Sequence, residues 1–345
     1  MTVTNPLAFT RRTVLFLPLG LLACKRGEVV HELTGATMGT TYSITAIDRD
    51  GAHSTSELQD AVDTVLAEVN TQMSNWDAAS EISRFNAAGA GETISVSPEL
   101  AHVMKAAQDV HEASDGQFDV TLGPLIDLWG FGAKNPGAQM PSEDAITTAL
   151  MASGQSRNIS VGSSSLTKGR DGTEVYLSAI GKGHGVDRVG EALERLGITD
   201  YLVEIGGDLR TAGMNPAGRP WQIGIEVPDA TTEGLQSVVG LSNMGLATSG
   251  DYRNYFEQDG VRYSHLLDAK TGRPVTHTTA SATVLTENAM MADAWATAML
   301  ILGRERGMEI AEDLNLAVLF VERDPSASEL KFIATPNARY SALQA

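Results

Sequence analysis

Apolar side chains recur along the chain in two different periods, and the period predicts which segments are strands and which are helices. Residues 29–34 and 40–47 alternate apolar and polar positions around Gly35 and Gly39, which predicts two strands joined as a hairpin. In the next segment the apolar residues lie three or four positions apart: Leu58, Val62, Val65, Leu66, Val69 and Met73. This spacing predicts a helix with one apolar face packed against the core.

The same periodicity, together with residues that favour helix ends, predicts further helices. Pro98 suits the first turn of a second helix, and Gly116 suits its end. A third helix is predicted from about Ser142 and a fourth over residues 186–196. A fifth, rich in Ala and Met, is predicted over 288–302.

Short strand-like segments with glycine-rich turns separate these helices, and this order decides the fold class. The Gly-, Ser- and Thr-rich stretch 154–172 is closely flanked by strand-like segments, so we interpret it as a surface loop and not as a domain linker. Hairpins with helices grouped between them do not fit a doubly wound parallel sheet, and no GxGxxG motif follows the first strand. We therefore expect a single α+β unit with mixed, largely antiparallel sheets and packed helices.

Composition and charge narrow the classes of partner. The chain has 345 residues, of which 42% are hydrophobic and 20% charged, enough to bury a full core. Its 43 acidic and 25 basic residues give a formal charge of −18, which repels a phosphate backbone, so no nucleic acid is expected as a partner. A phosphorylated small ligand would need a metal ion, a few well-placed basic side chains or backbone N–H groups at helix starts.

The N-terminal segment predicts export and a lipid anchor. A basic region precedes an apolar run at residues 14–23, which is too short to cross a bilayer as a helix. The only cysteine, Cys24, follows a small residue, as in a bacterial lipobox. Residues 1–23 are thus expected to be a signal peptide, with 24–345 held at the periplasmic side of a cell membrane by lipid on Cys24. The pair Arg11–Arg12 also favours twin-arginine export, and the alternative is a buried cysteine that carries no lipid.

The 288–302 helix carries a candidate metal site. It is apolar almost all round, so Asp293 is expected to be buried, and a buried carboxylate needs a cation or hydrogen-bond donors. Thr297 follows one turn later on the same face. Their oxygens are of the hard type that Mg²⁺ prefers. The alternative is that Asp293 caps a local group and Thr297 bonds back to its own helix.

A glycine-rich segment, Gly181–Gly185, is a candidate phosphate site at the start of the 186–196 helix. Its three glycines allow close approach of the backbone to a ligand, the helix start supplies N–H groups, and Lys182 adds a positive charge. The segment therefore predicts a phosphate cradle. The alternative is a flexible turn with a solvated lysine.

Other candidate residues are a histidine and two residues that could contact a flat ring. His265 alternates with Leu266 at the end of a predicted strand, where a neutral imidazole could accept a proton, although a structural histidine is the alternative. Asp268 is interpreted first as a turn residue. Trp76 could stack on a ring and Asp119 could hydrogen-bond one, but core packing or capping explains either equally well.

Taken in order, these segments resemble the ApbE family of FAD:protein FMN transferases. The resemblance runs from Met38 to Gly303. No single matching segment is specific to this family, but eight such segments in a fixed order are. The matching pieces are Met38–Thr40, Ser80–Asn86, Phe118–Asp119 with Gly123–Leu125, Ala179–Asp187, Ile205–Asp208, Thr248–Gly250, His265 with Asp268, and Asp293–Thr297.

The resemblance implies a mechanism and a set of site residues. A Mg²⁺ ion would be held by the Ala179 carbonyl, Asp293 and Thr297 and would bridge the FAD pyrophosphate, with His265 as the base. FMN would be joined by a phosphoester to a Ser or Thr of an acceptor flavoprotein, and AMP would be released. The resemblance also implies a set of residues that line the FAD site: Met38, Trp76, Gln117, Phe118, Asp119, Lys182 and Leu266.

Two other activities and two departures from the family pattern bear on this interpretation. The chain could instead be an FAD hydrolase that releases FMN and AMP, or a surface FAD-binding lipoprotein without turnover. Tyr176 stands where many relatives carry an acidic residue, and His184 stands where Tyr is usual. Both departures concern contacts with the rings of FAD.

Overall fold

The computed structural model describes residues 27–132, 140–229, 234–252, 254–258, 261–327 and 330–344. The expected signal peptide and Cys24 lie outside these residues, so both stay predictions. Within the described ranges, no helix is at once long and apolar enough to span a bilayer.

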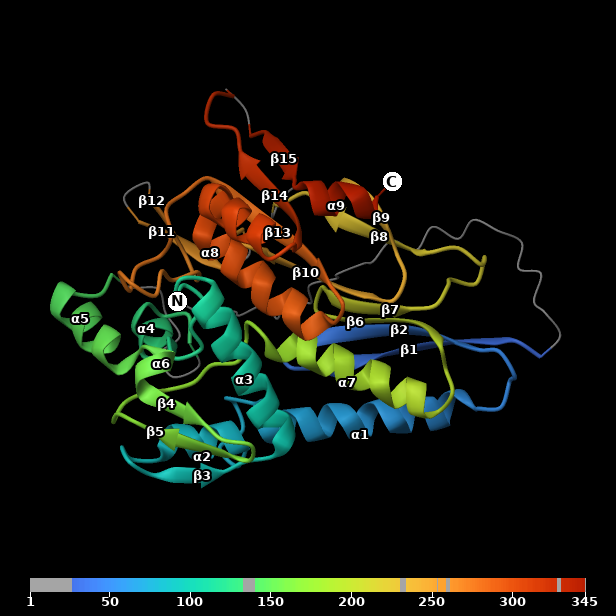
Figure 1. Ribbon diagram of the computed structural model, residues 1–345, viewed down its shortest axis with the longest axis horizontal. Helices are drawn as coiled ribbons and strands as arrows, with labels where there is room; N and C mark the ends of the chain where they lie inside the picture. The colour runs from blue at the N-terminus through green and yellow to red at the C-terminus, as the bar shows by residue number, and fades with distance from the viewer. Residues whose placement is uncertain are drawn as a thin grey trace, which may run out of the picture.

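An eight-stranded sheet runs through the centre of the molecule (Figure 1). Every neighbouring pair of its strands is antiparallel, and β1 and β2 form the expected hairpin. The prediction of an α+β fold with largely antiparallel sheets is therefore confirmed. In spatial order the strands are β1 (Val29–Thr37), β2 (Thr40–Asp48), β6 (Asp200–Ile205), β7 (Asp208–Ala212), β10 (Met244–Gly250), β13 (Thr279–Thr286), β14 (Ala317–Arg323) and β15 (Phe332–Pro336).

Long helices pack on one face of this sheet. In α1, the apolar residues that were predicted to form the core-facing side are the buried residues. α1 and α7 contact the β1–β2–β6 part of the sheet, and α8 and α3 share the largest apolar cluster with β10, β13 and β14 (Figure 1). These helices are α1 (Thr55–Met73), α3 (Pro98–Ala113), α7 (Gly181–Arg195) and α8 (Ala289–Asp313).

The opposite face of the sheet has its own apolar cover. Side chains alternate along β6, so Tyr201 and Val203 face α1 and α7 whereas Leu202 faces the other way. Leu202 packs with the hairpin of β8 (Trp221–Glu226) and β9 (Leu235–Leu241) and with the C-terminal helix α9 (Ala338–Leu343).

Smaller elements surround one end of the sheet. They are α2 (Glu81–Ala87), β3 (Thr93–Ser95), α4 (Gly123–Leu128), α5 (Glu143–Ala152), α6 (Gln155–Asn158), β4 (Ile159–Val161), β5 (Ser165–Lys168), β11 (Tyr255–Gln258) and β12 (Val261–Ser264). The expected loop at 154–172 was wrong, because α6, β4 and β5 lie within it. β5 pairs with both β3 and β4, and the side chains of Leu166 and Lys168 are buried.

The limits of two helices differ from those expected. α7 begins at Gly181 and not at residue 186, because acceptors are available to its first N–H groups: the Gly181 N–H donates to the Leu177 carbonyl. α8 continues past residue 302 to Asp313, although Gly303 interrupts it with a φ of +73°. Glycine thus marks a break inside this helix and not its end.

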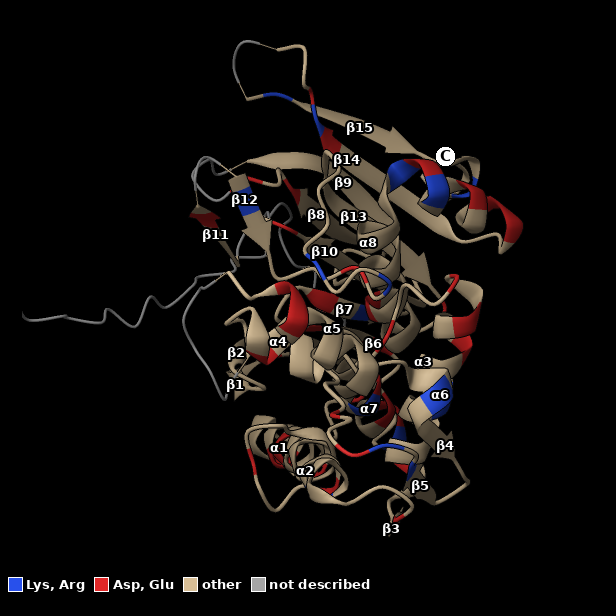
Figure 2. Cartoon of the chain, turned by 90° about the vertical axis from the view of Figure 1, so that its left-hand side faces the viewer, with Lys and Arg blue, Asp and Glu red and all other residues tan. Residues whose placement is uncertain are grey.

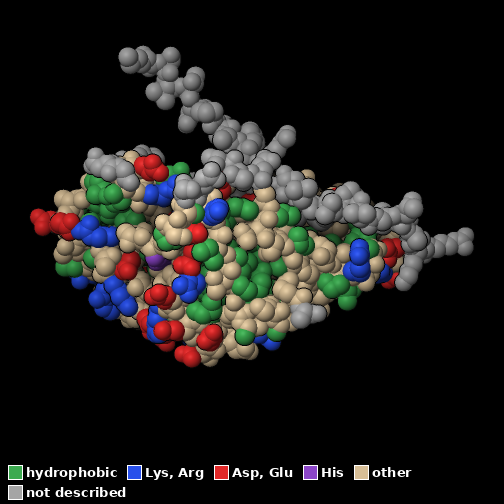
Figure 3. Space-filling view, turned by 90° about the horizontal axis from the view of Figure 1, so that it is seen from above, with side chains coloured by type: hydrophobic (Ala, Val, Ile, Leu, Met, Phe, Trp, Pro, Cys, Tyr) green, Lys and Arg blue, Asp and Glu red, His purple; other side chains and the backbone are tan. Residues whose placement is uncertain are grey.

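Charged side chains do not by themselves locate a site. Acidic side chains are spread over the molecule and are not gathered at one end (Figure 2). The face seen from above interleaves acidic, basic and apolar side chains (Figure 3). A candidate site must therefore be found from local contacts.

Candidate active site

Asp293 lies where α8 meets the first turn of α7. Its side chain is 3% exposed, and Oδ2 accepts a hydrogen bond from the Gly183 N–H at 3.1 Å. A Cβ at position 183 would collide with the Ala289 carbonyl oxygen and lie 2.8 Å from the Cβ of Asp293. The absence of a side chain at Gly183 is therefore what lets the two helices approach this closely.

A second buried carboxylate, Asp208, lies against Asp293. Asp208 is the first residue of β7 and is 2% exposed, and it forms an ion pair with the ammonium group of Lys182. Its carboxyl group is also in hydrogen-bond contact with Asp293. Burial and then the charge of Asp208 raise the pKa of Asp293 to about 7, although Lys182 and the Gly183 N–H act in the opposite direction. Two buried carboxylates in contact call for a proton or a cation.

Thr297 extends this group of oxygen atoms by one turn of α8. It is half-buried, and its hydroxyl is 3.0 Å from the hydroxyl of Ser249 on β10. The observed contact therefore runs across to the sheet and not back along its own helix.

Ala179 precedes α7 in a turn and is half-buried. In a regular helix the N–H of residue 183 would bond to the carbonyl of residue 179. Here the Gly183 N–H bonds to Asp293, so it leaves the Ala179 carbonyl oxygen to other partners. A carbonyl oxygen can bind a metal ion only if it is not already occupied in this way.

The expected cradle of free N–H groups is not what the glycine-rich segment forms. The N–H of Gly181 bonds to Leu177, that of Gly183 to Asp293, and that of His184 to Ile180. The protein itself satisfies these three N–H groups, so the structure does not support them as phosphate donors, and phosphate binding by the segment stays a prediction. Lys182 is the positive group that this segment contributes.

The donor set suits a hard cation. Carboxylate, hydroxyl and carbonyl oxygens are the ligands that Mg²⁺ prefers, and Mg²⁺ usually keeps several positions for water and substrate phosphate. Within the described part of the chain, no three His, Cys, Asp or Glu side chains form a complete metal centre. A cation at Asp293 would therefore also need hydroxyl, carbonyl, water or phosphate oxygens.

His265 lies just past the end of β12, with one ring nitrogen fixed. Nδ1 is 3.0 Å from the Asn254 carbonyl oxygen, which can only accept, so Nδ1 carries the proton and Nε2 keeps its lone pair. The ring of Phe131 meets the imidazole edge-on at 6.4 Å. Burial lowers the pKa of His265, although the Asn254 carbonyl and Asp251 act in the opposite direction. The imidazole is therefore suited to accept a proton at Nε2.

Several other expected residues lie around one apolar cluster. Phe118 and Leu266 are buried in the cluster that contains much of α8, and Met38 and Ala179 pack against it. Gln117 Nε2 is 3.5 Å from an oxygen of Asp268, which brings the 117–119 segment beside the turn after His265. These residues, distant in sequence, share one region of the molecule.

Met38 occupies the turn between β1 and β2 with a φ of +50°. Its side chain fills the space beside Gly185, where a Cβ would lie 2.5 Å from the methionine methyl group. A second glycine of α7 thus makes room for a neighbouring element.

Two expected FAD contacts have local roles in this structure. Both carboxylate oxygens of Asp119 accept from backbone N–H groups, those of Thr121 at 2.7 Å and Gln155 at 3.0 Å. These bonds fit capping, the alternative to ring binding, and FAD binding by Asp119 stays a prediction. The ring of Phe118 is 1% exposed in the core, and its contact with FAD stays a prediction.

Trp76 is placed differently, with 81% of its surface exposed. The Asn75 side chain donates to the Val175 carbonyl at 2.7 Å and so holds this loop next to Tyr176. Ring stacking by Trp76 stays a prediction.

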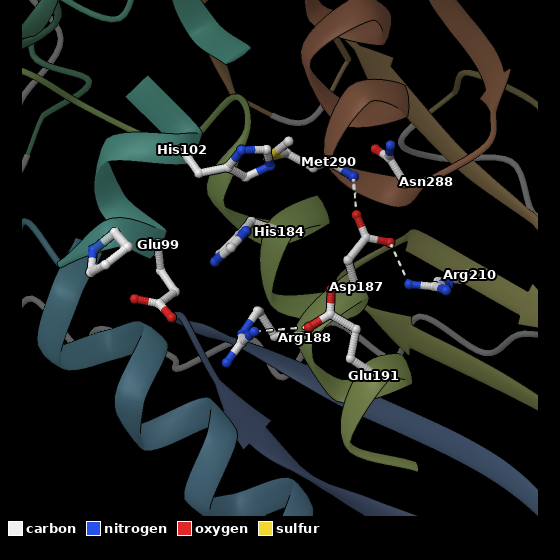
Figure 4. A pocket seen from close by; sticks show the side chains of 10 residues that line it. Glu99, His102, His184, Asp187, Arg188, Glu191, Arg210, Asn288 and Met290 are labelled. Carbon is white, nitrogen blue, oxygen red and sulfur yellow. Dashed lines mark hydrogen bonds and ion pairs between the residues drawn. The ribbon is translucent and has the colours of Figure 1, made fainter. Parts of the chain in front are cut away.

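The two positions that depart from the family pattern make contacts of their own. The Tyr176 hydroxyl donates to Asp127 at 3.2 Å. His184 lines a separate pocket of about 290 Å³ between α3, α7 and α8 (Figure 4). Burial and then Arg188 lower the pKa of His184 to about 4. Asp187 lines the same pocket and accepts from the Met290 N–H at 2.8 Å, whereas Asp293 is absent from its lining.

Fold and site together define a class of protein. It is an antiparallel α+β protein in which a buried carboxylate pair beside a lysine can bind a cation and, through it, an anionic ligand. The base with a fixed tautomer, His265, directly precedes Leu266, which is buried in the same apolar cluster as much of α8.

Residues 38–320 match the model of the ApbE family, and the chain belongs to that family. It is 42% identical over 302 residues to the FAD:protein FMN transferase of Vibrio cholerae, covering 87% of this chain and 90% of that protein. The enzyme of the same name from Haemophilus influenzae is 40% identical over 313 residues, with 89% and 90% covered. The crystal structure of Pseudomonas stutzeri flavinyl transferase ApbE in its apo form superimposes with a TM-score of 0.84 at 36% identity, covering 92% of this chain and 97% of that one.

Sequence reasoning assigned no role to two residues of this site. Asp208 entered only as part of a matching piece, and Ser249 likewise. An aspartate directly after an apolar strand and two glycines was the available signal for Asp208. Nothing in the spacing of Ser249 indicated that it would meet Thr297.

Proposed function

We propose that the protein is a Mg²⁺-dependent FAD:protein FMN transferase. It cleaves FAD, joins FMN by a phosphoester to a Ser or Thr hydroxyl of an acceptor flavoprotein and releases AMP. The observation that carries the proposal is the contact between the buried carboxylates Asp293 and Asp208 beside Lys182. The named activity of the related enzymes from Vibrio cholerae and Haemophilus influenzae supports it.

The residues around Asp293 would hold the ion and the pyrophosphate. Asp293, the Thr297 hydroxyl and the Ala179 carbonyl are the proposed ligands. When bound there, Mg²⁺ neutralises pyrophosphate charge and stabilises the AMP leaving group. Lys182 adds a second positive charge. This arrangement lets a chain of net charge −18 bind a dianionic group.

His265 would prepare the acceptor hydroxyl. Its Nε2 takes the hydroxyl proton as the acceptor oxygen forms a bond to the phosphorus of the FMN half. The phosphoanhydride bond breaks, and the electron pair leaves with AMP. Donation of the Nδ1 proton to Asn254 holds the ring in the tautomer that this step requires.

We also propose that lipid on Cys24 anchors the protein at the periplasmic side of a cell membrane. Only residues 25–28 separate Cys24 from β1, so the anchor would hold the folded domain close to the membrane surface. Acceptors would then be flavoproteins that face the periplasm.

The test of the transferase is an acceptor assay. Purified protein is incubated with FAD, Mg²⁺ and periplasm-facing flavoproteins from the same organism, and covalent flavin is detected by in-gel fluorescence. We expect a fluorescent acceptor band that disappears with EDTA. Rapid AMP release without acceptor would identify a hydrolase instead, and FAD that stays intact for hours would identify a binding protein.

A further inference from the structure

Asp208 is placed inside the molecule by the turn that precedes it. Gly206 and Gly207 have φ values of +57° and +98°, in the left-handed region that favours glycine, and they turn the chain sharply between β6 and β7. The carboxylate of Asp208 consequently reaches Lys182 on α7 and Asp293 on α8. A strand and two helices thus bring their charged groups to one buried point.

The positive charge of Lys182 does not by itself neutralise the negative charges of Asp208 and Asp293. One ammonium group faces two carboxylates, so the fully ionised cluster carries one uncompensated negative charge. An uncompensated buried charge is strongly destabilising. The cluster therefore has a place for one more positive group.

We propose that Asp208 is a second carboxylate ligand, direct or through one water, of the divalent cation at Asp293. This inference rests on the proposed function, because it assumes the cation. A divalent ion changes the formal charge of the cluster with Lys182 from −1 to +1. The cluster then attracts the pyrophosphate that it would otherwise repel. Ligands on both β7 and α8 also fix the ion between two rigid elements.

A purely structural role for Asp208 gives a different expectation. If Asp208 only anchored Lys182, its loss would weaken binding of the ion only in a chain that still carries Lys182. If Asp208 is a ligand, its loss weakens binding of the ion, whereas loss of Lys182 removes a repelling charge and leaves binding equal or tighter. The effect of Asp208→Asn, measured both in the wild type and in Lys182→Met, therefore separates the two roles.

The experiment is a titration of the purified chain with Mn²⁺, which shares the oxygen-ligand preference of Mg²⁺, with free Mn²⁺ followed by electron paramagnetic resonance. We expect Asp208→Asn to weaken Mn²⁺ binding by about tenfold to hundredfold, as loss of a carboxylate next to a metal ligand commonly does. Lys182→Met should bind as well as the wild type or better. Asp200→Asn is the matched control, because Asp200 is also a buried first residue of a strand paired with a basic side chain, Arg49 at 3.0 Å.

The outcomes separate this inference from the proposed function. Binding within twofold of the wild type in Asp208→Asn overturns the role of Asp208 and leaves the transferase intact. The role of Asp208 is also overturned if the wild type transfers FMN with Mg²⁺ but binds no Mn²⁺ alone. If Asp208→Asn alone does not fold, the same change in Lys182→Met, where its charge partner is also removed, decides: unchanged binding relative to Lys182→Met refutes the proposal, and weaker binding supports it. Absence of both Mn²⁺ binding and Mg²⁺-dependent transfer contradicts both.

Discussion

At the scale of single residues, the buried carboxylate Asp293 links stability to pH. Its pKa in the folded protein is raised from 3.8 to about 7, mainly by burial and then by Asp208. A carboxyl group that keeps its proton longer when folded makes the free energy of unfolding fall as pH rises from about 4 to about 7. This effect belongs to the metal-free protein, because a bound cation favours the ionised form.

Asp293→Asn should remove this dependence. Asparagine cannot ionise but can still accept from the Gly183 N–H. With EDTA at pH 8 we expect the variant to be more stable than the wild type by about 2–4 kcal/mol, and the difference to shrink toward pH 4. Urea unfolding at both pH values measures it. The same pH dependence in both proteins would show that Asp293 is not the group responsible.

His265 controls a different property, the rate of transfer. We expect His265→Gln to lower the single-turnover rate of FMN transfer by about 10²–10⁴-fold while FAD binding stays unchanged. His277→Gln is the matched control, because His277 is also a half-buried histidine with a ring nitrogen near a backbone carbonyl, that of Ile301 at 3.2 Å. An equal loss of rate in both variants would remove His265 from the role of base.

The pH profile of the wild type provides a second check on His265. Because burial lowers its pKa, the neutral imidazole should persist below the ordinary value of 6.5. The transfer rate should therefore be retained at mildly acidic pH and fall only as the ring becomes protonated. In His265→Gln this acidic decline should be absent from the residual rate. A decline that begins well above pH 6.5 would contradict the assignment.

At the scale of elements, the close crossing of α7 and α8 depends on Gly183. We expect Gly183→Ala to destabilise the protein by about 1–3 kcal/mol and to weaken activity, because its Cβ would meet the Ala289 carbonyl and Asp293. Gly181→Ala, two residues earlier, meets nothing nearer than 3.7 Å and should be tolerated. Thermal unfolding of both variants checks this, and equal midpoints would contradict it.

The sequence was sufficient for elements whose signals are local. The period of apolar residues predicted α1, and Ser142 does act as the N-cap of α5. The start of α7 could not be predicted, because Gly181–Gly185 has no helical preference of its own. Its N–H groups find acceptors in Leu177, Asp293 and Ile180, and Asp293 is brought there only by the tertiary fold.

In the candidate site, too, the sequence predicted local properties but not the contacts that depend on the tertiary fold. Burial of Asp293 followed from the apolar helix around it. The contact of Asp208 with Asp293 could not be predicted, because it joins a strand and a helix 85 positions apart in the chain. The tautomer of His265 depends on Asn254, which the sequence did not distinguish from any other loop residue.

At the scale of the whole molecule, the anchor decides which acceptors the enzyme meets. Cys24→Ser should move the protein from the membrane fraction to the soluble periplasmic fraction, because its thiol is the proposed point of lipid attachment. Activity on a purified acceptor should not change. Fractionation followed by immunoblotting measures this, and a variant that stays with the membrane would exclude Cys24 as the anchor.

The central claim is that a divalent cation binds at Asp293 and contacts the pyrophosphate of FAD. Its most direct test is a crystal structure of the protein with FAD and Mn²⁺, with the ion located by anomalous scattering. The account predicts one anomalous peak within about 2.0–2.3 Å of an Asp293 oxygen and of a phosphate oxygen. Bound FAD whose pyrophosphate lies away from Asp293, with no peak between them, would contradict it.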